Sequence, residues 1–304
     1  MPEPKPLGPL ESPAYEILDP RFTPCVVPGG RVERLWTGGE WAEGPAWFGA
    51  GYLLWSDIPN NVMLRWDAAS NSTSVFRHPS NGSNGNTVDR QGRLVTCETL
   101  ARRVTRTSPD GEITVLADRS NGQRLRAPND VVEKSDGSIW FTDPSYGSGP
   151  LASGETEVAG CHVYRLDPAT GDVRQMTHDM VMPNGLAFSL DERHLFIVDT
   201  GSTEYTNGPN HIRRFTLGLD HTLTGGVVFA ESATKKFDGI RFDSEGRLWC
   251  AAEDGAHCYT PDGTLIGKLK LPERAANLTF GPEGWMLLTA TTSLYRVPVN
   301  ARRP

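Results

Sequence analysis

Residues 129–143 read NDVVEKSDGSIWFTD, two short apolar runs separated by a polar turn that contains Gly137. Each run is too short for an ordinary helix and is rich in β-branched or aromatic residues. Short runs of this kind on either side of a turn predict a β-hairpin. The hairpin begins with an amide side chain, Asn129, and ends with a carboxylate, Asp143.

The same hairpin design recurs six times along the chain. Its apolar second strands lie between 38 and 56 residues apart and begin at Leu53, Leu94, Ile139, Leu195, Leu248 and Met286. Five of the six turns contain glycine, and the fourth has Asp191-Glu-Arg instead. A degenerate repeat of this length is typical of propeller blades, each of which is a four-stranded antiparallel sheet.

The repeat therefore predicts an all-β fold, a six-bladed β-propeller that occupies residues 29–304 as a single domain. A strand from Val32 to Trp36 precedes the first unit. We expect it to complete the last blade and close the ring, which would leave no long exposed strand edge. Residues 1–28 are expected to form an N-terminal arm wrapped over the propeller.

Composition excludes several classes of protein. Hydrophobic residues make up 38% and charged residues 22% of the 304 residues, as in soluble globular proteins. A net charge of −7 without any Lys/Arg run argues against a nucleic-acid partner. No stretch of 18 apolar residues could span a membrane. The five cysteines show no Cys-x-x-Cys pair and predict free thiols. Without a signal-peptide pattern, a cytoplasmic location is expected.

The register of the repeat places six polar side chains on the propeller axis. The first strand of each blade lines the central channel, and here these strands start at Glu43, Asn84, Asn129, Asn184, Asp238 and Asn277. A single Asn or Asp could simply be a turn residue. That interpretation explains neither Glu43 nor an oxygen-bearing side chain in all six units. Carboxylates that converge on a channel repel one another unless a cation neutralises them, and all-oxygen ligation suits Ca²⁺, Mg²⁺ or Mn²⁺. We predict one divalent metal ion on the axis.

Five motifs in order, at blade spacing, resemble the senescence-marker protein/gluconolactonase family, also called the regucalcin-like family. The resemblance covers about residues 39–297. Its motifs are Glu43-Gly-Pro-Ala-Trp, Ser83-Asn-Gly-Asn-Thr, Pro128-Asn-Asp with Trp140-Phe-Thr-Asp-Pro-Ser-Tyr-Gly, Pro183-Asn-Gly-Leu and Phe237-Asp-Gly-Ile-Arg-Phe-Asp. The third of these is similar to the bacterial gluconolactonase branch in particular.

The resemblance implies a carboxylic-ester hydrolase that opens a sugar lactone to the aldonic acid. Its metal ligands would be Glu43, Asn129, Asn184 and Asp238. Ca²⁺ is the favoured ion, and Zn²⁺, Mn²⁺, Mg²⁺ and Fe²⁺ are alternatives. The ion would polarise the lactone carbonyl and stabilise the oxyanion while water attacks. The proton of the water would pass to Asp238 or to hydroxide on the metal.

Substrate contacts are expected from five further side chains, Asn84, Asn86, Arg126, Tyr146 and Asn277. The sequence departs from the family at one of them. Sugar-lactone-binding relatives carry an arginine two residues before the asparagine that matches Asn129, whereas here that position is Ala127 and Arg126 lies one residue further away. Asp130 is a second candidate carboxylate, after Asp238, for accepting the proton of the water, but on a regular strand it would face away from the channel.

Two other functions stay open. The same scaffold could hydrolyse other esters or phosphotriesters, because a fold does not fix a substrate. The protein could also be a non-catalytic propeller that binds calcium. A serine hydrolase is not indicated, since the chain has no Gly-x-Ser-x-Gly motif.

Overall fold

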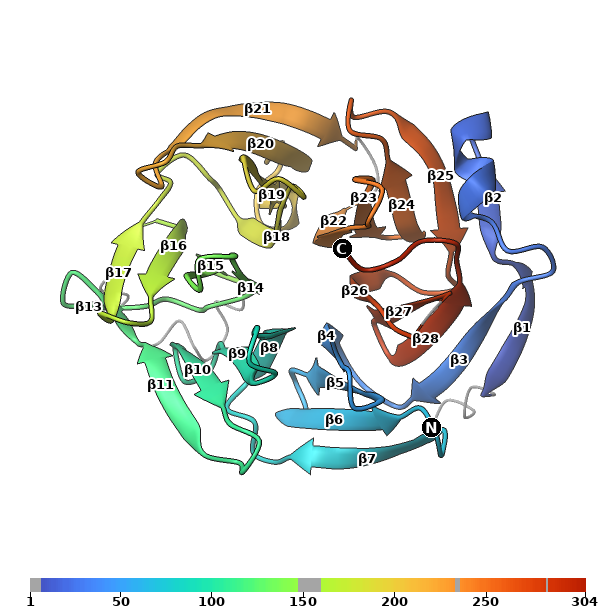
Figure 1. Ribbon diagram of the computed structural model, residues 1–304, viewed down its shortest axis with the longest axis horizontal. Coiled ribbons are helices and arrows are strands. Elements are labelled where there is room, and N and C mark those ends of the chain that lie inside the picture. Colours follow the sequence, from blue (N-terminus) through green and yellow to red (C-terminus); the bar gives the residue numbers. More distant parts are fainter. Residues whose placement is uncertain (1–6, 147–159, 233–235, 283) are drawn as a thin grey trace.

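The computed structural model describes residues 7–146, 160–232, 236–282 and 284–304. Six antiparallel sheets are arranged as blades around a central axis (Figure 1). The predicted six-bladed propeller is therefore confirmed. In the first four blades the first strand along the chain lies next to the axis and the later strands lie progressively further out, and in the last two the N-terminal segment adds the outermost strands.

The blades follow one another in sequence order. Blade one contains β4 (Ala42–Phe48), β5 (Tyr52–Asp57), β6 (Val62–Asp67) and β7 (Ser72–Arg77). Blade two contains β8 (Ser83–Val88), β9 (Leu94–Glu98), β10 (Arg103–Thr107) and β11 (Ile113–Ala117). Blade three contains β14 (Val131–Glu133), β15 (Ile139–Asp143), β16 (His162–Asp167) and β17 (Asp172–Gln175). Blade four contains β18 (Pro183–Phe188), β19 (His194–Asp199), β20 (His211–Leu217) and β21 (Leu223–Glu231). Blade five contains β22 (Phe237–Phe242), β23 (Leu248–Ala252), β24 (Gly255–Tyr259) and β25 (Leu265–Lys270). Blade six contains β26 (Ala275–Phe280), β27 (Trp285–Ala290) and β28 (Ser293–Pro298). A small hairpin of β12 (Arg119–Ser120) and β13 (Gln123–Arg124) connects blades two and three.

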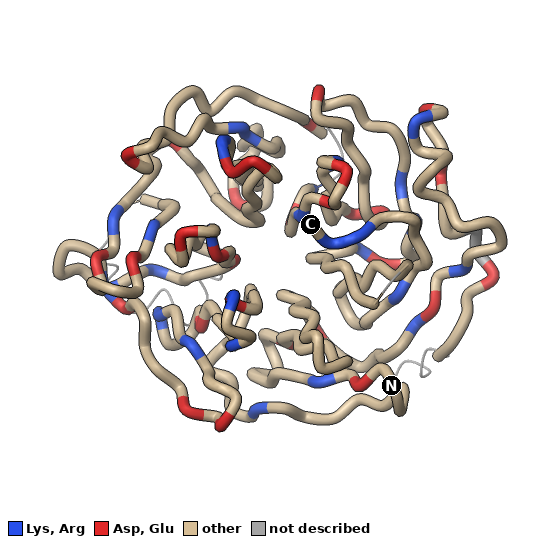
Figure 2. Tube along the Cα trace, viewed as in Figure 1, with Lys and Arg blue, Asp and Glu red and all other residues tan. Residues whose placement is uncertain are grey.

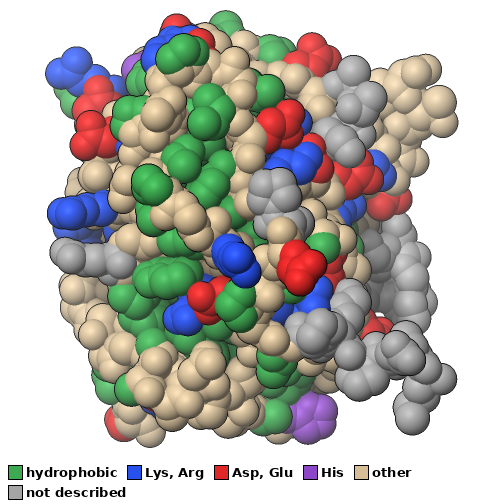
Figure 3. Space-filling view, turned by 90° about the vertical axis from the view of Figure 1, so that its right-hand side faces the viewer, with side chains coloured by type: hydrophobic (Ala, Val, Ile, Leu, Met, Phe, Trp, Pro, Cys, Tyr) green, Lys and Arg blue, Asp and Glu red, His purple; other side chains and the backbone are tan. Residues whose placement is uncertain are grey.

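The N-terminal segment closes the ring. Strand β3 (Arg31–Thr37) pairs antiparallel with β28, so the predicted closure of the last blade is confirmed. Strand β1 (Gly8–Pro13) extends the same sheet, and β2 (Tyr15–Ile17) pairs with β25 of blade five. The side of the molecule to which these strands contribute shows apolar side chains among charged ones (Figure 3). The segment thus joins blades five and six along their outer edges.

The hydrophobic core of the described residues is divided among the interfaces between blades. Six clusters of buried side chains occur, and each combines residues from two neighbouring blades. Trp140 of blade three, for example, packs with Leu186 and Ile197 of blade four. Since apolar burial is the main favourable contribution to folding, each blade depends on both neighbours for stability.

Residues of both charge signs are distributed around the ring. Lys and Arg are interspersed with Asp and Glu along the chain in Figure 2. The helical segments of the described residues are short 3₁₀ turns, among them η1 (Pro20–Cys25), and none is long and apolar enough to cross a membrane. All five cysteines are free, in agreement with the sequence-based prediction.

A repeated carboxylate clamp fixes the backbone that enters the inner strands of three blades. The aspartate at the end of the second strand accepts hydrogen bonds from two consecutive backbone amides in the loop that leads into the first strand of the same blade. The pairs are Asp57 with Glu40 and Trp41 (both 3.2 Å), Asp143 with Arg126 and Ala127 (2.9 and 2.5 Å), and Asp199 with Val181 and Met182 (2.9 and 2.8 Å). Each clamp ends two residues before an axial side chain, namely Glu43, Asn129 or Asn184. It therefore sets the register in which that side chain reaches the axis.

The inner strands approach one another too closely for a side chain at the residue after several axial positions. A Cβ added at Gly85 would lie 2.4 Å from the Asn129 carbonyl oxygen, and one at Gly44 would lie 2.1 Å from the Asn84 carbonyl oxygen. The Gly85 amide also donates a hydrogen bond of 2.7 Å to that Asn129 oxygen. Glycine at these positions is thus required by contact between neighbouring blades.

We expect Gly85→Ala to lower the free energy of unfolding by about 2–4 kcal/mol, because the new methyl group must displace backbone of blade three. Gly49→Ala is the matched control. Both glycines lie outside the left-handed region, but a Cβ at Gly49 would meet nothing within 4 Å. The control should change stability by less than about 1 kcal/mol. Equal denaturation midpoints for the two variants would contradict the close-approach explanation.

Candidate metal centre

Five of the six axial residues lie at or near the start of an inner strand, and Asn129 lies just before β14. They surround the end of the channel at which the inner strands begin, which we call the front mouth. Glu43 and Asp238, from blades one and five, are the two carboxylates of the ring, and only 6% and 3% of their surfaces are exposed. The structure thus buries two carboxylates from different blades close enough to interact electrostatically.

The two carboxylates occupy an unfavourable electrostatic environment. Burial raises the pKa of Glu43 well above its usual value, and the negative charges of Asp238 and Asp130 raise it further. Burial also raises the pKa of Asp238 to about 6, although the neighbouring Arg274 and Asn184 oppose the shift. Ionised carboxylates that are desolvated together favour a cation between them.

Neutral side chains connect the carboxylates. The Asn277 side chain lowers the pKa of Glu43, and the Asn184 side chain lowers the pKa of Asp238, so each amide lies near one carboxylate. The Asn184 amide nitrogen also lies 3.4 Å from the Tyr146 hydroxyl, which contacts Thr200 in addition. Burial and the charge of Asp238 raise the pKa of Tyr146 well above its usual value, so this residue acts as a neutral phenol. The structure therefore brings Glu43, Asn184, Asp238, Asn277 and Tyr146 together.

The expectation that Asp130 faces away from the channel is wrong. Asp130 is 1% exposed, interacts electrostatically with both axial carboxylates, and lies 3.5 Å from the guanidinium of Arg241 in blade five. Strand β14 begins only at Val131, so the alternation of a regular strand does not apply to this position. A third carboxylate, paired with Arg241, thus lies behind the ring.

Arg274 is a front-mouth residue that the sequence did not reveal. It lies in the loop before β26, and its guanidinium donates a hydrogen bond of 3.0 Å to Asp238. The same group lies 5.0 Å from the centre of the Trp41 ring. No repeat signal marks an arginine in a connecting loop, although Arg274 is three residues before Asn277 just as Arg126 is three residues before Asn129.

The remaining predicted substrate residues have other environments. Asn86 is fully buried, and its amide bonds the Gly44 and Asn84 carbonyl oxygens at 2.9 Å, so it links blades one and two and does not fit a substrate contact. The guanidinium of Arg126 donates to the Gly160 carbonyl oxygen at 3.4 Å. Asn84 is buried and lies 3.5 Å from the Thr99 hydroxyl.

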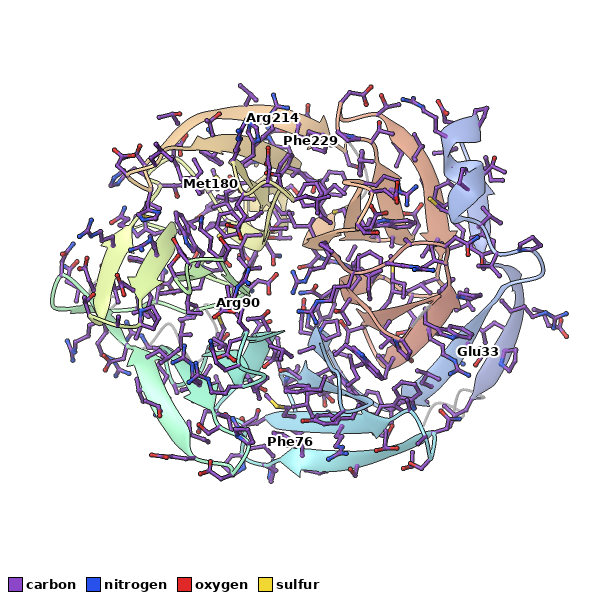
Figure 4. All side chains as sticks on the ribbon, viewed as in Figure 1. Glu33, Phe76, Arg90, Met180, Arg214 and Phe229 are labelled. Atoms are coloured by element: carbon purple, nitrogen blue, oxygen red, sulfur yellow. The ribbon has the colours of Figure 1, made fainter. Side chains whose placement is uncertain are left out.

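A cavity of about 550 Å³ lies at the opposite end of the inner strands. Its lining includes Trp47, Phe188, Arg241 and Arg90, and Arg90 is labelled near the axis in Figure 4. None of the four predicted metal ligands lines it. The chemistry of buried carboxylates therefore points to the front mouth and not to this cavity.

The donor set of the front mouth suits a hard divalent ion. Two buried carboxylates and the amide oxygens of Asn129 and Asn184 offer oxygen ligands only, which Ca²⁺, Mg²⁺ and Mn²⁺ accept. Among the residues that the structure describes, no cluster of three or more His, Cys, Asp or Glu side chains could hold a metal. Any ion at this centre would depend on the asparagines as well as on Glu43 and Asp238.

The fold and this ring define a six-bladed propeller with an oxygen-lined axial centre. The chain belongs to the SMP-30/gluconolactonase/LRE-like family, because residues 41–293 match the sequence model of that family.

It is similar to a gluconolactonase of Zymomonas mobilis, with 27% identity over 92% of this chain and 84% of that protein. A solved gluconolactonase from Xanthomonas campestris has 33% identity over 97% of this chain and 98% of the other, with a TM-score of 0.88. A calcium-binding regucalcin from Agrobacterium tumefaciens shares the fold, with a TM-score of 0.71 at 20% identity over 89% and 95% of the two chains.

We expect metal affinity to depend on pH. Because the pKa of Asp238 is raised to about 6 and that of Glu43 is also raised, protons compete with a cation as the pH falls. The affinity for Ca²⁺ should decrease roughly tenfold per pH unit below about pH 6 for each carboxyl that must lose a proton. Calorimetry in two buffers of different ionisation enthalpy would measure the protons released. A constant affinity between about pH 5 and pH 8 would contradict the assignment.

The free energy of unfolding of the metal-free protein should change with pH in the opposite direction to the Ca²⁺ affinity. A raised pKa means that the folded state keeps protons that the unfolded chain loses at lower pH. Stability should therefore decrease as the pH rises from about 4 to about 6, and added Ca²⁺ should reverse this loss.

Proposed function

We propose that this protein is a metal-dependent lactonase that hydrolyses a sugar lactone to the aldonic acid. The observation that carries the proposal is the pair of buried carboxylates, Glu43 and Asp238, that face the axis with raised pKa values. A structural scaffold gains nothing from burying two repelling acids. Membership of a family that includes gluconolactonases supports the same reaction.

Glu43, Asn129, Asn184 and Asp238 would hold the ion, and Ca²⁺ suits this all-oxygen set best. When bound, the ion supplies a Lewis acid for the lactone carbonyl and positive charge for the developing oxyanion. Zn²⁺, Mn²⁺, Mg²⁺ and Fe²⁺ are the alternatives to test.

The protein residues would perform the remaining tasks. Asp238 is the candidate to accept a proton from the attacking water, and as a ligand of the ion it would be a weaker base than in the metal-free site, where its pKa is raised to about 6. Tyr146 and Asn277, both at the front mouth, would contact hydroxyl groups of the sugar, and Asn84 is the third candidate. We propose that residues 29–304 form the catalytic propeller and that residues 1–28 form an N-terminal arm. The cytoplasmic location stays a prediction.

Asp238→Asn tests the proposal most simply. The variant keeps the shape of the side chain but removes one metal-binding charge and the proposed base. We expect lactonase activity to fall at least about 100-fold and Ca²⁺ affinity to fall at least about tenfold. Asp110→Asn, at an exposed position, is the control and should behave as wild type. Wild-type activity and metal content in Asp238→Asn would refute the mechanism.

A substrate panel separates the remaining alternatives. Aldonolactones, simple aryl esters and phosphotriesters should be compared with and without added metal. We expect the highest kcat/KM for an aldonolactone, with loss of activity after chelation and recovery after metal is restored. Preference for a phosphotriester would indicate the second hydrolase, and metal binding without any turnover would indicate a calcium-binding propeller.

A further inference from the structure

The front mouth contains one guanidinium group whose surroundings point to a ligand. Arg274 donates through Nη2 to Asp238 Oδ2 at 3.0 Å, and its side chain is 22% exposed. The ring of Trp41, from the loop before β4, lies 5.0 Å from the guanidinium carbon. An aromatic face and a carboxylate together hold the group at one orientation. Arg274 is thus prepositioned beside the proposed metal ligand.

This guanidinium still has hydrogen-bonding capacity to offer. Its Nε is buried and has no hydrogen-bond partner among the described residues. An unsatisfied buried donor is unfavourable, more so when the group is charged. A ligand oxygen at the front mouth would instead meet the accessible part of the Arg274 side chain, which is 22% exposed.

The charges around the axis also favour a negatively charged ligand oxygen. Asp130 is paired with Arg241, and a divalent ion would balance Glu43 and Asp238. The guanidinium of Arg274 would then be one positive charge in excess at the front mouth. Hydrolysis of a lactone creates negative charge, first on the carbonyl oxygen and then on the carboxylate of the product.

Arg126 has the equivalent register in blade three but a different environment. Its guanidinium donates to the Gly160 carbonyl oxygen and makes no described contact with Glu43 or Asp238. Ala127, one residue closer to Asn129, has no side-chain donor. Arg274, in blade six, offers a guanidinium group that contacts Asp238 directly.

We propose that Arg274 is the substrate-binding arginine of this site and that it binds the acyl oxygens of the lactone and of the aldonate product. The inference rests on the proposed lactonase function. The planar guanidinium can donate two hydrogen bonds to a carboxylate, which makes the product the sharpest probe.

The test is titration of D-gluconate into the Ca²⁺-loaded protein by calorimetry, together with KM and kcat for gluconolactone. We expect Arg274→Gln to weaken gluconate binding and to raise KM, each at least about tenfold, since a charge-assisted hydrogen bond is lost. Arg274→Lys should recover only part of the affinity. Ca²⁺ affinity should be unchanged or tighter, because a cation beside Asp238 has been removed.

Arg65→Gln is the matched control. Arg65 also lies over an aromatic ring, 4.1 Å from the centre of Tyr52, and pairs with Asp67 at 3.3 Å, but on β6 away from the axis. Its gluconate affinity should equal that of wild type.

Wild-type gluconate affinity in Arg274→Gln would overturn the inference. Loss of Ca²⁺ affinity with an unchanged KM would also overturn it, because Arg274 would then only position Asp238. Failure of the proposed function is distinguishable, since the wild-type protein itself would then hydrolyse no lactone.

Discussion

Neighbouring inner strands of this propeller approach one another so closely that the residue after four axial positions has no room for a Cβ. Gly44 and Gly85 meet the backbone of the next blade, Gly185 meets the Asp238 carbonyl oxygen, and Gly239 meets the side chain of Asn277. This contact narrows the ring and brings polar side chains from different blades within hydrogen-bonding distance. The fold and the centre therefore have a common origin, because the glycines that let the blades close also bring the axial residues together.

The close packing has an electrostatic cost. Three carboxylates, Glu43, Asp130 and Asp238, are buried and interact electrostatically, and described ion pairs to Arg241 and Arg274 balance only two of them. The raised pKa values of Glu43 and Asp238 express that imbalance. A divalent ion on the axis would supply the missing charge, and the same charge would polarise a carbonyl group. Stability of the ring and chemistry at the ring would thus depend on one ion.

The sequence predicted the features that repeat. Six hairpins at regular spacing gave the blades, and one register within them gave the axial positions, because propeller blades use equivalent residues in equivalent places. Features that do not repeat were missed or given the wrong orientation. Arg274 belongs to a connecting loop, and Asp130 precedes a short strand in which alternation fails. Asn86 looked like a ligand from its type alone, whereas its hydrogen bonds link two blades. The clamp aspartates were visible at the strand ends, but their partners are backbone amides that no side-chain pattern reveals.

We propose that one ion binds on the axis among these oxygen atoms. Anomalous X-ray diffraction from crystals loaded with Mn²⁺ would locate the ion without reference to activity. We expect a single strong peak at the front mouth, about 2–2.6 Å from side-chain oxygens of Glu43, Asn184 and Asp238. A peak at another place, or none at the axis while the protein retains lactonase activity, would contradict it.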